Sequence, residues 1–184
     1  MERLAASARS DRYGRRINRE QSPWRALSVP YLSIALASAI PFVFLADVMP
    51  IAPPLGYLML LGWRIMRPGL LPLWAGAPLG AFDDLFSGQP FGSAILLWSM
   101  TMIVLELIEA RFPWRGFWQD WFTAGLAALT YIAVAMVVSG GQITRPMVLA
   151  ALPQVVLSIL LYPFLSQAVA GLDRFRLSRA RRVG

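Results

Sequence analysis

Six apolar segments, separated by short polar stretches, occupy the middle of the chain. Five of them are 17 residues or longer, which is the range in which an α-helix can cross a bilayer. The second segment is shorter. This pattern predicts an all-α membrane protein, a six-helix transmembrane bundle over residues 26–170, with helices at about 26–46, 53–66, 70–86, 90–107, 122–138 and 147–169.

Prolines mark several of the predicted helix ends. Pro53 and Pro54 can open the short second helix, because proline suits the first helical turn, where its missing N–H is not needed. Pro90 ends the third helix and starts the fourth. Pro153 and Pro163 predict kinks in the last helix unless neighbours bind the freed carbonyls. Either the second helix crosses the membrane fully or it lies partly buried among the others.

Arginine is concentrated in the two tails, residues 1–25 and 171–184. With six alternating spans, all but one of the 17 basic residues fall on the side of the tails, and Arg145 alone falls on the other. The positive-inside rule then places both termini in the cytoplasm. No apolar run directly follows the charged start, so residues 1–25 are expected to be a tail and not a cleaved leader.

The composition narrows the chemistry that this chain can perform. It is 57% hydrophobic and contains no cysteine, histidine or lysine. Imidazole bases, thiolate nucleophiles, Schiff-base lysines and the common zinc motifs are thereby excluded. We expect no catalytic residue, no cofactor and no metal. Because the positive charge lies in the tails, we expect anionic lipids as its partner, and no nucleic acid.

A stripe of glycine and aspartate extends from the third predicted helix, through the turn, into the start of the fourth. Small or acidic residues recur at every fourth position, at Gly76, Gly80, Asp84, Gly88 and Gly92. Residues four apart lie on one face of a helix, and glycines on such a face let a second backbone approach closely. This stripe is predicted to be a helix-packing and interaction motif, together with Asp83 and Pro90.

Adjacent carboxylates, Asp83 and Asp84, stand within this stripe. An acidic residue costs roughly 3 kcal/mol at the centre of a membrane helix, so it is expected to have a partner or a function. We hypothesise that Asp84 binds the free N–H groups at Gly92 and Ser93 and so ties the third helix to the fourth. Two alternatives stay open: both aspartates lie in water beside a plain packing stripe, or the pair relays protons.

Other polar residues are assigned structural roles. Glu106 and Glu109 are expected to form interfacial ion pairs with Arg64, Arg67 or Arg111.

Three tryptophan and two glutamine residues are also predicted to have structural roles. Trp114, Trp118 and Trp121 are predicted to form an aromatic belt at headgroup depth. Gln154 and Gln167, in the last segment, are expected to form hydrogen bonds across helices.

One region of the chain resembles the MreD family of rod-shape-determining proteins of the bacterial inner membrane. The resemblance at residue level covers about residues 53–98, and the size and six-span layout agree over nearly the whole chain. The positions that carry it are Trp63, Pro68, Gly80, Asp84, Gly88 and Gly92. The family pattern has one acidic residue at this place, and Asp83 is an additional one in this chain.

This resemblance implies a non-enzymatic subunit of the cell-elongation machinery. Such proteins associate with the periplasmic scaffold MreC and, through the complex, with the MreB filament, RodA and a class B penicillin-binding protein. The implied location is the bacterial inner membrane, crossed several times.

A rival prediction belongs to another class. The fold of that family is similar to the substrate-binding subunits of energy-coupling-factor vitamin transporters, which dock their partner through alanines four residues apart. Ala35 and Ala39 have this spacing. Such a subunit needs polar groups around a periplasmic pocket, and the segment 83–93, Gln142 and Thr144 could supply them.

Overall fold

The computed structural model describes residues 23–44, 52–112, 116–140 and 144–177. This part of the chain contains six α-helices, one 3-10 helix and no strand, so the all-α fold class is confirmed. In chain order the elements are α2 (Pro23–Phe44), α3 (Leu55–Met66), η2 (Leu73–Ala75), α4 (Gly76–Asp84), α5 (Ser93–Arg111), α6 (Phe117–Val138) and α7 (Arg145–Leu177).

Three of the described helices, α5, α6 and α7, are long and apolar enough to cross a membrane. At 1.5 Å per residue, the 19 residues of α5 extend for about 28 Å, close to the thickness of a hydrocarbon core. Shorter apolar helical segments lie at Leu27–Val43, within α2, and at Leu55–Met66, which is α3.

The short helix α3 lies at the centre of the fold. Ten of its 12 residues are buried, and α2, α5, α6 and α7 all contact it. A helix that is apolar on every side is expected to be buried in this way. Its length of about 18 Å is less than the thickness of a hydrocarbon core. The helix is therefore surrounded by its neighbours, one of the two arrangements that the sequence left open.

The third predicted helix, 70–86, is much shorter in the structure. Gly69 has a φ of +79° and Pro72 is extended, so the chain cannot be helical between them. The single turn η2 precedes α4, which has only nine residues. Pro78 lies in the first turn of α4, where its missing N–H leaves no hydrogen bond unmade.

The fourth predicted helix, 90–107, also has different bounds. It starts at Ser93 and not at Pro90, because Gly92 has a φ of +100° and separates the turn from α5. The helix continues to Arg111. The fifth, expected at 122–138, begins earlier, at Phe117, where the Gln119 side chain accepts a hydrogen bond from the Gly116 N–H at 3.0 Å.

Helix α7 is longer than the predicted segment 147–169. It includes residues 171–177, which the sequence assigned to the C-terminal tail. Asp173 binds both Arg67 and Arg176, so these last turns are attached to the bundle. The rest of that tail and residues 1–22 of the N-terminal tail lie outside the described residues.

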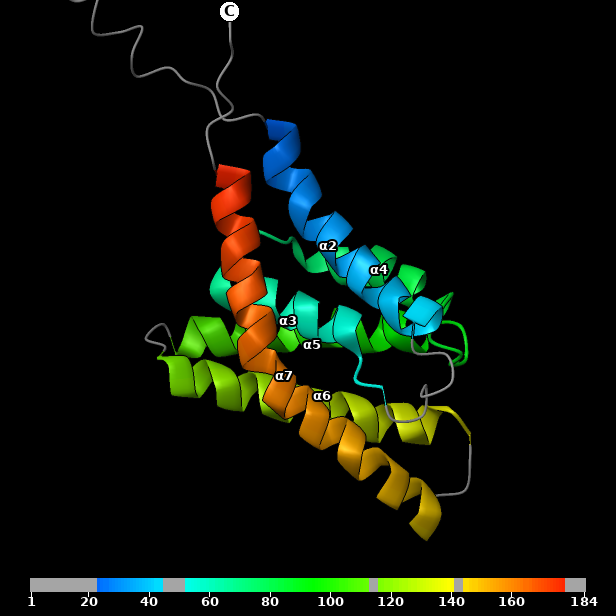
Figure 1. Ribbon diagram of the computed structural model, residues 1–184. Coiled ribbons are helices and arrows are strands. Elements are labelled where there is room, and N and C mark those ends of the chain that lie inside the picture. Colours follow the sequence, from blue (N-terminus) through cyan, green and yellow to red (C-terminus); the bar gives the residue numbers. More distant parts are fainter. Residues whose placement is uncertain (1–22, 45–51, 113–115, 141–143, 178–184) are drawn as a thin grey trace, which may run out of the picture.

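Two prolines stand inside α7, and the helix continues through both of them. Pro163 has no N–H for the carbonyl of Ile159, four residues earlier. The Trp121 side chain of α6 donates a hydrogen bond to that carbonyl at 3.0 Å. A neighbouring helix therefore binds the carbonyl that Pro163 leaves free. Figure 1 shows that α7 changes direction along its length.

The helix ends lie on two sides of the molecule (Figure 1). One side, which we term the hairpin end, contains the turn 84–93 between α4 and α5, the end of α6 and the start of α7. The other, termed the arginine end, contains the ends of α3, α5 and α7 and the start of α6. Its arginines are Arg64, Arg67, Arg111, Arg174 and Arg176.

Candidate functional site

Asp84 joins α4 to the start of α5. Its carboxylate accepts hydrogen bonds from the Gly92 N–H at 2.8 Å, from the Ala94 N–H at 2.9 Å and from the Ser93 hydroxyl at 3.2 Å. The first N–H groups of a helix have no partner within the helix, and they favour a negative charge. The hypothesis of an Asp84 contact is confirmed, with the Ala94 N–H in place of that of Ser93. We term this contact the Asp84 cap.

Two glycines of α4 bring its backbone close to α5. A Cβ atom at Gly80 would lie 2.6 Å from the Ala94 carbonyl oxygen, and one at Gly76 would lie 3.0 Å from the Ser99 Cα. Both contacts are with backbone, which cannot turn aside. The predicted packing role of these glycines is therefore confirmed, and it places Asp84 against the start of α5.

Gly88 and Gly92 act differently from the packing glycines. Helix α4 ends at Asp84, so neither residue continues the stripe on a helical face, which corrects the prediction of one stripe through Gly92. Their φ angles are +68° and +100°, values that side-chain-bearing residues rarely adopt. They shape the turn. Pro90 lies in the same turn, and its carbonyl accepts the Ser93 N–H at 3.1 Å.

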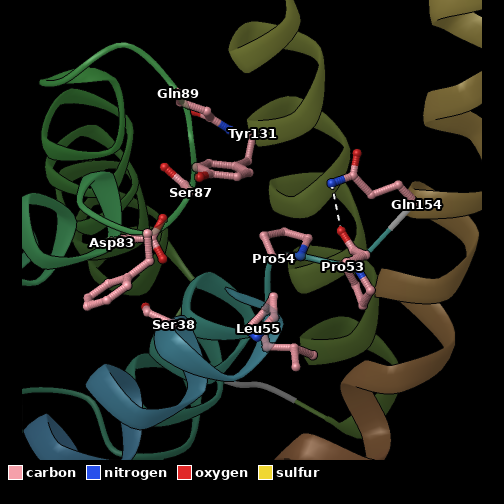
Figure 2. A pocket seen from close by; sticks show the side chains of 13 residues that line it. Ser38, Pro53, Pro54, Leu55, Asp83, Ser87, Gln89, Tyr131 and Gln154 are labelled. Carbon is pink, nitrogen blue, oxygen red and sulfur yellow. Dashed lines mark hydrogen bonds between the residues drawn. The ribbon is translucent and has the colours of Figure 1, made fainter. Parts of the chain in front are cut away.

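Asp83 faces away from the Asp84 cap and lines a cavity of about 80 Å³ at the hairpin end. Figure 2 shows its carboxylate between the hydroxyls of Ser38 and Ser87, with Tyr131 nearby. The remaining lining residues come from α2, from the segment before α3, from the start of α3, from the hairpin and from α7: Pro41, Ala52, Pro53, Pro54, Leu55, Gly56, Phe86, Gln89 and Gln154. Thus the adjacent aspartates have different surroundings.

A second hollow, of about 130 Å³, shares Gln89, Tyr131 and Gln154 with the first. The hydrogen bond that was predicted for Gln154 across helices is made instead to the segment before α3, where the Ala52 carbonyl accepts it at 2.9 Å. Gln167 is exposed instead.

The sequence interpretation did not identify Ser38 and Tyr131 as parts of a site. Each is a polar residue in a mainly apolar helix, but other serine, threonine and tyrosine residues of α2 and α6 share that property, so it does not single out these two. Their meeting point could not be found that way, because α2 and α6 are far apart in the sequence.

Arg64 binds two carboxylates at the arginine end. Its side chain is only 1% exposed, and it forms ion pairs with Glu106 and, at 2.8 Å, with Glu109. The predicted pairing of these glutamates is confirmed for Arg64. Arg67 instead pairs with Asp173 of α7, and Arg111 is exposed.

The family-pattern residue Trp63 is fully buried beside this charge group. Its indole N–H donates a hydrogen bond to the Ser33 hydroxyl at 2.9 Å, and the Arg176 guanidinium lies 5.7 Å from its ring centre. Pro68 is exposed in the turn after α3. Both residues therefore have structural positions at the arginine end.

The predicted tryptophan belt is found only in part. Trp118 is exposed, as an anchor at headgroup depth would be. Trp121 is partly buried and bonds to α7, so its contact is with protein. Trp114 lies outside the described residues.

The residues that suggested a transporter subunit are brought together only in part. Asp83, Ser87 and Gln89 of the segment 83–93 line the cavity. Thr144 is exposed in a separate open hollow with Arg145, and Gln142 lies outside the described residues. Ala35 and Ala39 are partly buried in α2.

Among the described residues, no group of three or more histidine, cysteine, aspartate or glutamate side chains could hold a metal ion. Comparisons with protein-family models, with curated proteins and with solved structures find no match for this chain. What the site offers chemically is a rigid hairpin, bound through backbone N–H groups, and one carboxylate facing a small cavity.

Proposed function

We propose that this chain is a non-enzymatic membrane subunit that holds other proteins together, similar in role to MreD of the bacterial rod-shape machinery. In this proposal it crosses the inner membrane several times, with both termini in the cytoplasm. It assembles an MreC-type scaffold and, through that scaffold, the MreB filament, RodA and a class B penicillin-binding protein.

The observation that carries this proposal is the construction of the hairpin end. Four positions of the family-like pattern, Gly80, Asp84, Gly88 and Gly92, all serve one structure: the close contact and turn between α4 and α5. These residues fix a backbone shape and present no reactive group. Such a set suits a subunit that offers a rigid surface to a partner.

Apolar side chains on the same hairpin give a partner something to bind. Leu85 is 66% exposed and Phe91 is 73% exposed, one on each side of the turn. Aromatic residues on a rigid support are common anchors of protein interfaces. We propose that the scaffold contacts this hairpin.

The proposed orientation is supported by the distribution of arginine over the two ends. Five described arginines lie at the arginine end, whereas Arg145 starts α7 at the hairpin end. Under the positive-inside rule, the arginine end faces the cytoplasm and the hairpin faces the periplasm. Reporter fusions at the two termini test this orientation, and activity of a periplasmic reporter at either terminus would contradict it.

Co-purification with an MreC-type scaffold tests the proposed function. We expect the wild-type chain to retain the scaffold in detergent, and Phe91→Ala to lose most of it, because the anchor is removed. Leu126→Ala is the matched control, since Leu126 is 65% exposed on α6, away from the hairpin. The proposal fails if the wild-type chain does not retain the scaffold.

The polar cavity favours one second candidate, the binding subunit of a vitamin transporter. However, pockets for drug-sized ligands enclose about 300–1,000 Å³. The cavity of about 80 Å³ is too small for such a ligand. Thermal stabilisation of the purified chain by a vitamin at micromolar concentration would favour this candidate over the assembly subunit.

A further inference from the structure

Asp83 is a buried carboxylate without a cation. Its residue is 9% exposed, and among the described residues no arginine forms an ion pair with it. Asp84, the adjacent acid, is bound by backbone N–H groups that do not reach Asp83. A buried charge is costly unless it is paired. A cation that binds beside Asp83 would therefore remove this cost, which favours its binding.

The described residues do not supply such a group at the hairpin end. The neighbouring segments 45–51 and 141–143 contain no basic residue in their sequence. Arg145 is exposed and lines a different hollow, with Thr144, Val148 and Leu149. The other described arginines lie at the arginine end. Among the described residues and these two segments, no cation is therefore available to Asp83.

Two serine hydroxyl groups flank the carboxylate. The Ser87 hydroxyl is buried without a hydrogen-bond partner among the described residues, and the Ser38 hydroxyl lies beside the carboxylate. Figure 2 shows these oxygens around the same space. A carboxylate flanked by hydroxyl oxygens suits a cation that carries several N–H donors, as ammonium and guanidinium groups do.

We propose that the cavity formed by Asp83, Ser38 and Ser87 binds one ammonium or guanidinium group that enters from the hairpin end. The volume of about 80 Å³ suits the head of such a group and no larger molecule. One carboxylate balances one positive charge. This proposal goes beyond the assembly function and does not depend on it, because the cavity can bind a cation whether or not a scaffold docks.

Binding of small probes to the full-length chain in a neutral detergent tests the proposal. The probes are methylguanidinium and methylammonium, with acetamide as an uncharged probe of similar size and sodium chloride to hold the ionic strength constant. Ligand-observed NMR gives each dissociation constant. We expect saturable binding of both organic cations, and none of acetamide.

Variants identify the site. We expect Asp83→Asn to weaken the binding of methylguanidinium at least tenfold and Ser87→Ala to weaken it several-fold. Thr130→Ala is the control, because Thr130 is exposed on α6 and its hydroxyl bonds only to its own helix. Equal binding by wild type and Asp83→Asn, or by acetamide and the cations, overturns the proposal. If Asp83→Asn does not fold, the double variant Ser38→Ala/Ser87→Ala decides in the same way.

Two sources could provide the cationic group: a free amine, or a basic side chain of a periplasmic protein. Native mass spectrometry of the chain released from membranes distinguishes them. A small adduct that Asp83→Asn loses identifies a free amine, and a protein that Asp83→Asn loses identifies a side chain. Failure of scaffold co-purification would leave the probe result unaffected, so the two proposals fail separately.

Discussion

The two ends of this molecule neutralise their carboxylates in different ways. At the arginine end, Glu106 and Glu109 pair with Arg64, and Asp173 pairs with Arg67 and Arg176. At the hairpin end, Asp84 is bound by backbone N–H groups, and Asp83 faces a cavity. These three carboxylates of the arginine end pair with arginines of the same chain. At the hairpin end, no described arginine pairs with Asp83.

This difference indicates where each end can change its partners. Ion pairs between helices fix the arginine end, and replacing one member leaves another charge unpaired. The Asp84 cap holds the hairpin through the first N–H groups of α5. The exposed side chains of the hairpin take no part in the cap and are available to bind a partner. We therefore expect substitutions at the arginine end to lower stability, and some substitutions at the hairpin end to change binding alone.

The largest effect is expected for Arg64→Ala. The change removes the Arg64 cation from Glu109, which is largely buried, and from Glu106, which is exposed. Breaking a buried pair in this way costs about 3–5 kcal/mol. The free energy of unfolding in detergent measures it. Arg111→Ala is the control, because Arg111 is exposed, and equal losses in both variants would contradict the buried pairing.

Gly80→Ala is expected to have the next largest effect. The new methyl group would lie 2.6 Å from a backbone oxygen of α5, so the helices have to separate. Overpacking of this kind costs about 1–3 kcal/mol. Gly125→Ala is the matched control, since its nearest atom, in the Ile159 side chain, is at 3.5 Å. Thermal unfolding of both variants tests the prediction, and equal stability would show that α4 and α5 are not in close contact.

Gly92→Ala is expected to destabilise the hairpin by about 1–2 kcal/mol, because an L-residue at a φ of +100° is strained. The space around the Cβ is open, so the loss reports backbone conformation alone. The change in unfolding midpoint measures this loss. A midpoint equal to that of the wild type would mean that the turn adopts another conformation.

Trp121→Phe is expected to have a smaller effect, about 0.5–1.5 kcal/mol, because it removes the hydrogen bond to the Ile159 carbonyl. Trp118→Phe is the control, since Trp118 is exposed. Equal unfolding free energies for the two variants would show that the carbonyl freed by Pro163 does not need Trp121.

The sequence predicted the parts of this fold that depend on local spacing. Glycines four residues apart indicated the contact of α4 with α5, and the short distance from Asp84 to Gly92 indicated the cap. Proline positions indicated helix ends only approximately, since the fourth helix starts at Ser93 and not at Pro90. They did not indicate that Pro72 and Gly69 would reduce the third helix to nine residues. Glycine permits several backbone conformations and proline fixes only φ, so neither residue alone determines where a helix ends.

Contacts between distant segments could not be predicted. Asp173 was assigned to a tail, yet it pairs with Arg67, 106 residues earlier. The cavity brings together α2, the hairpin and α6, and no local pattern relates Ser38 to Tyr131. The sequence suggested the Asp84 cap but left the role of Asp83 open. Only the structure shows that they point to different surroundings.

The central claim is that Asp84 stabilises the hairpin and Asp83 does not. Unfolding free energies of Asp84→Asn and Asp83→Asn, measured side by side in one detergent, test it most directly. We expect Asp84→Asn to lose about 1.5–3 kcal/mol, because the charge-assisted bonds to α5 are weakened. We expect Asp83→Asn to lose no stability, because it removes a buried charge that no described arginine pairs. Equal losses in the two variants, or a larger loss in Asp83→Asn, would contradict the claim.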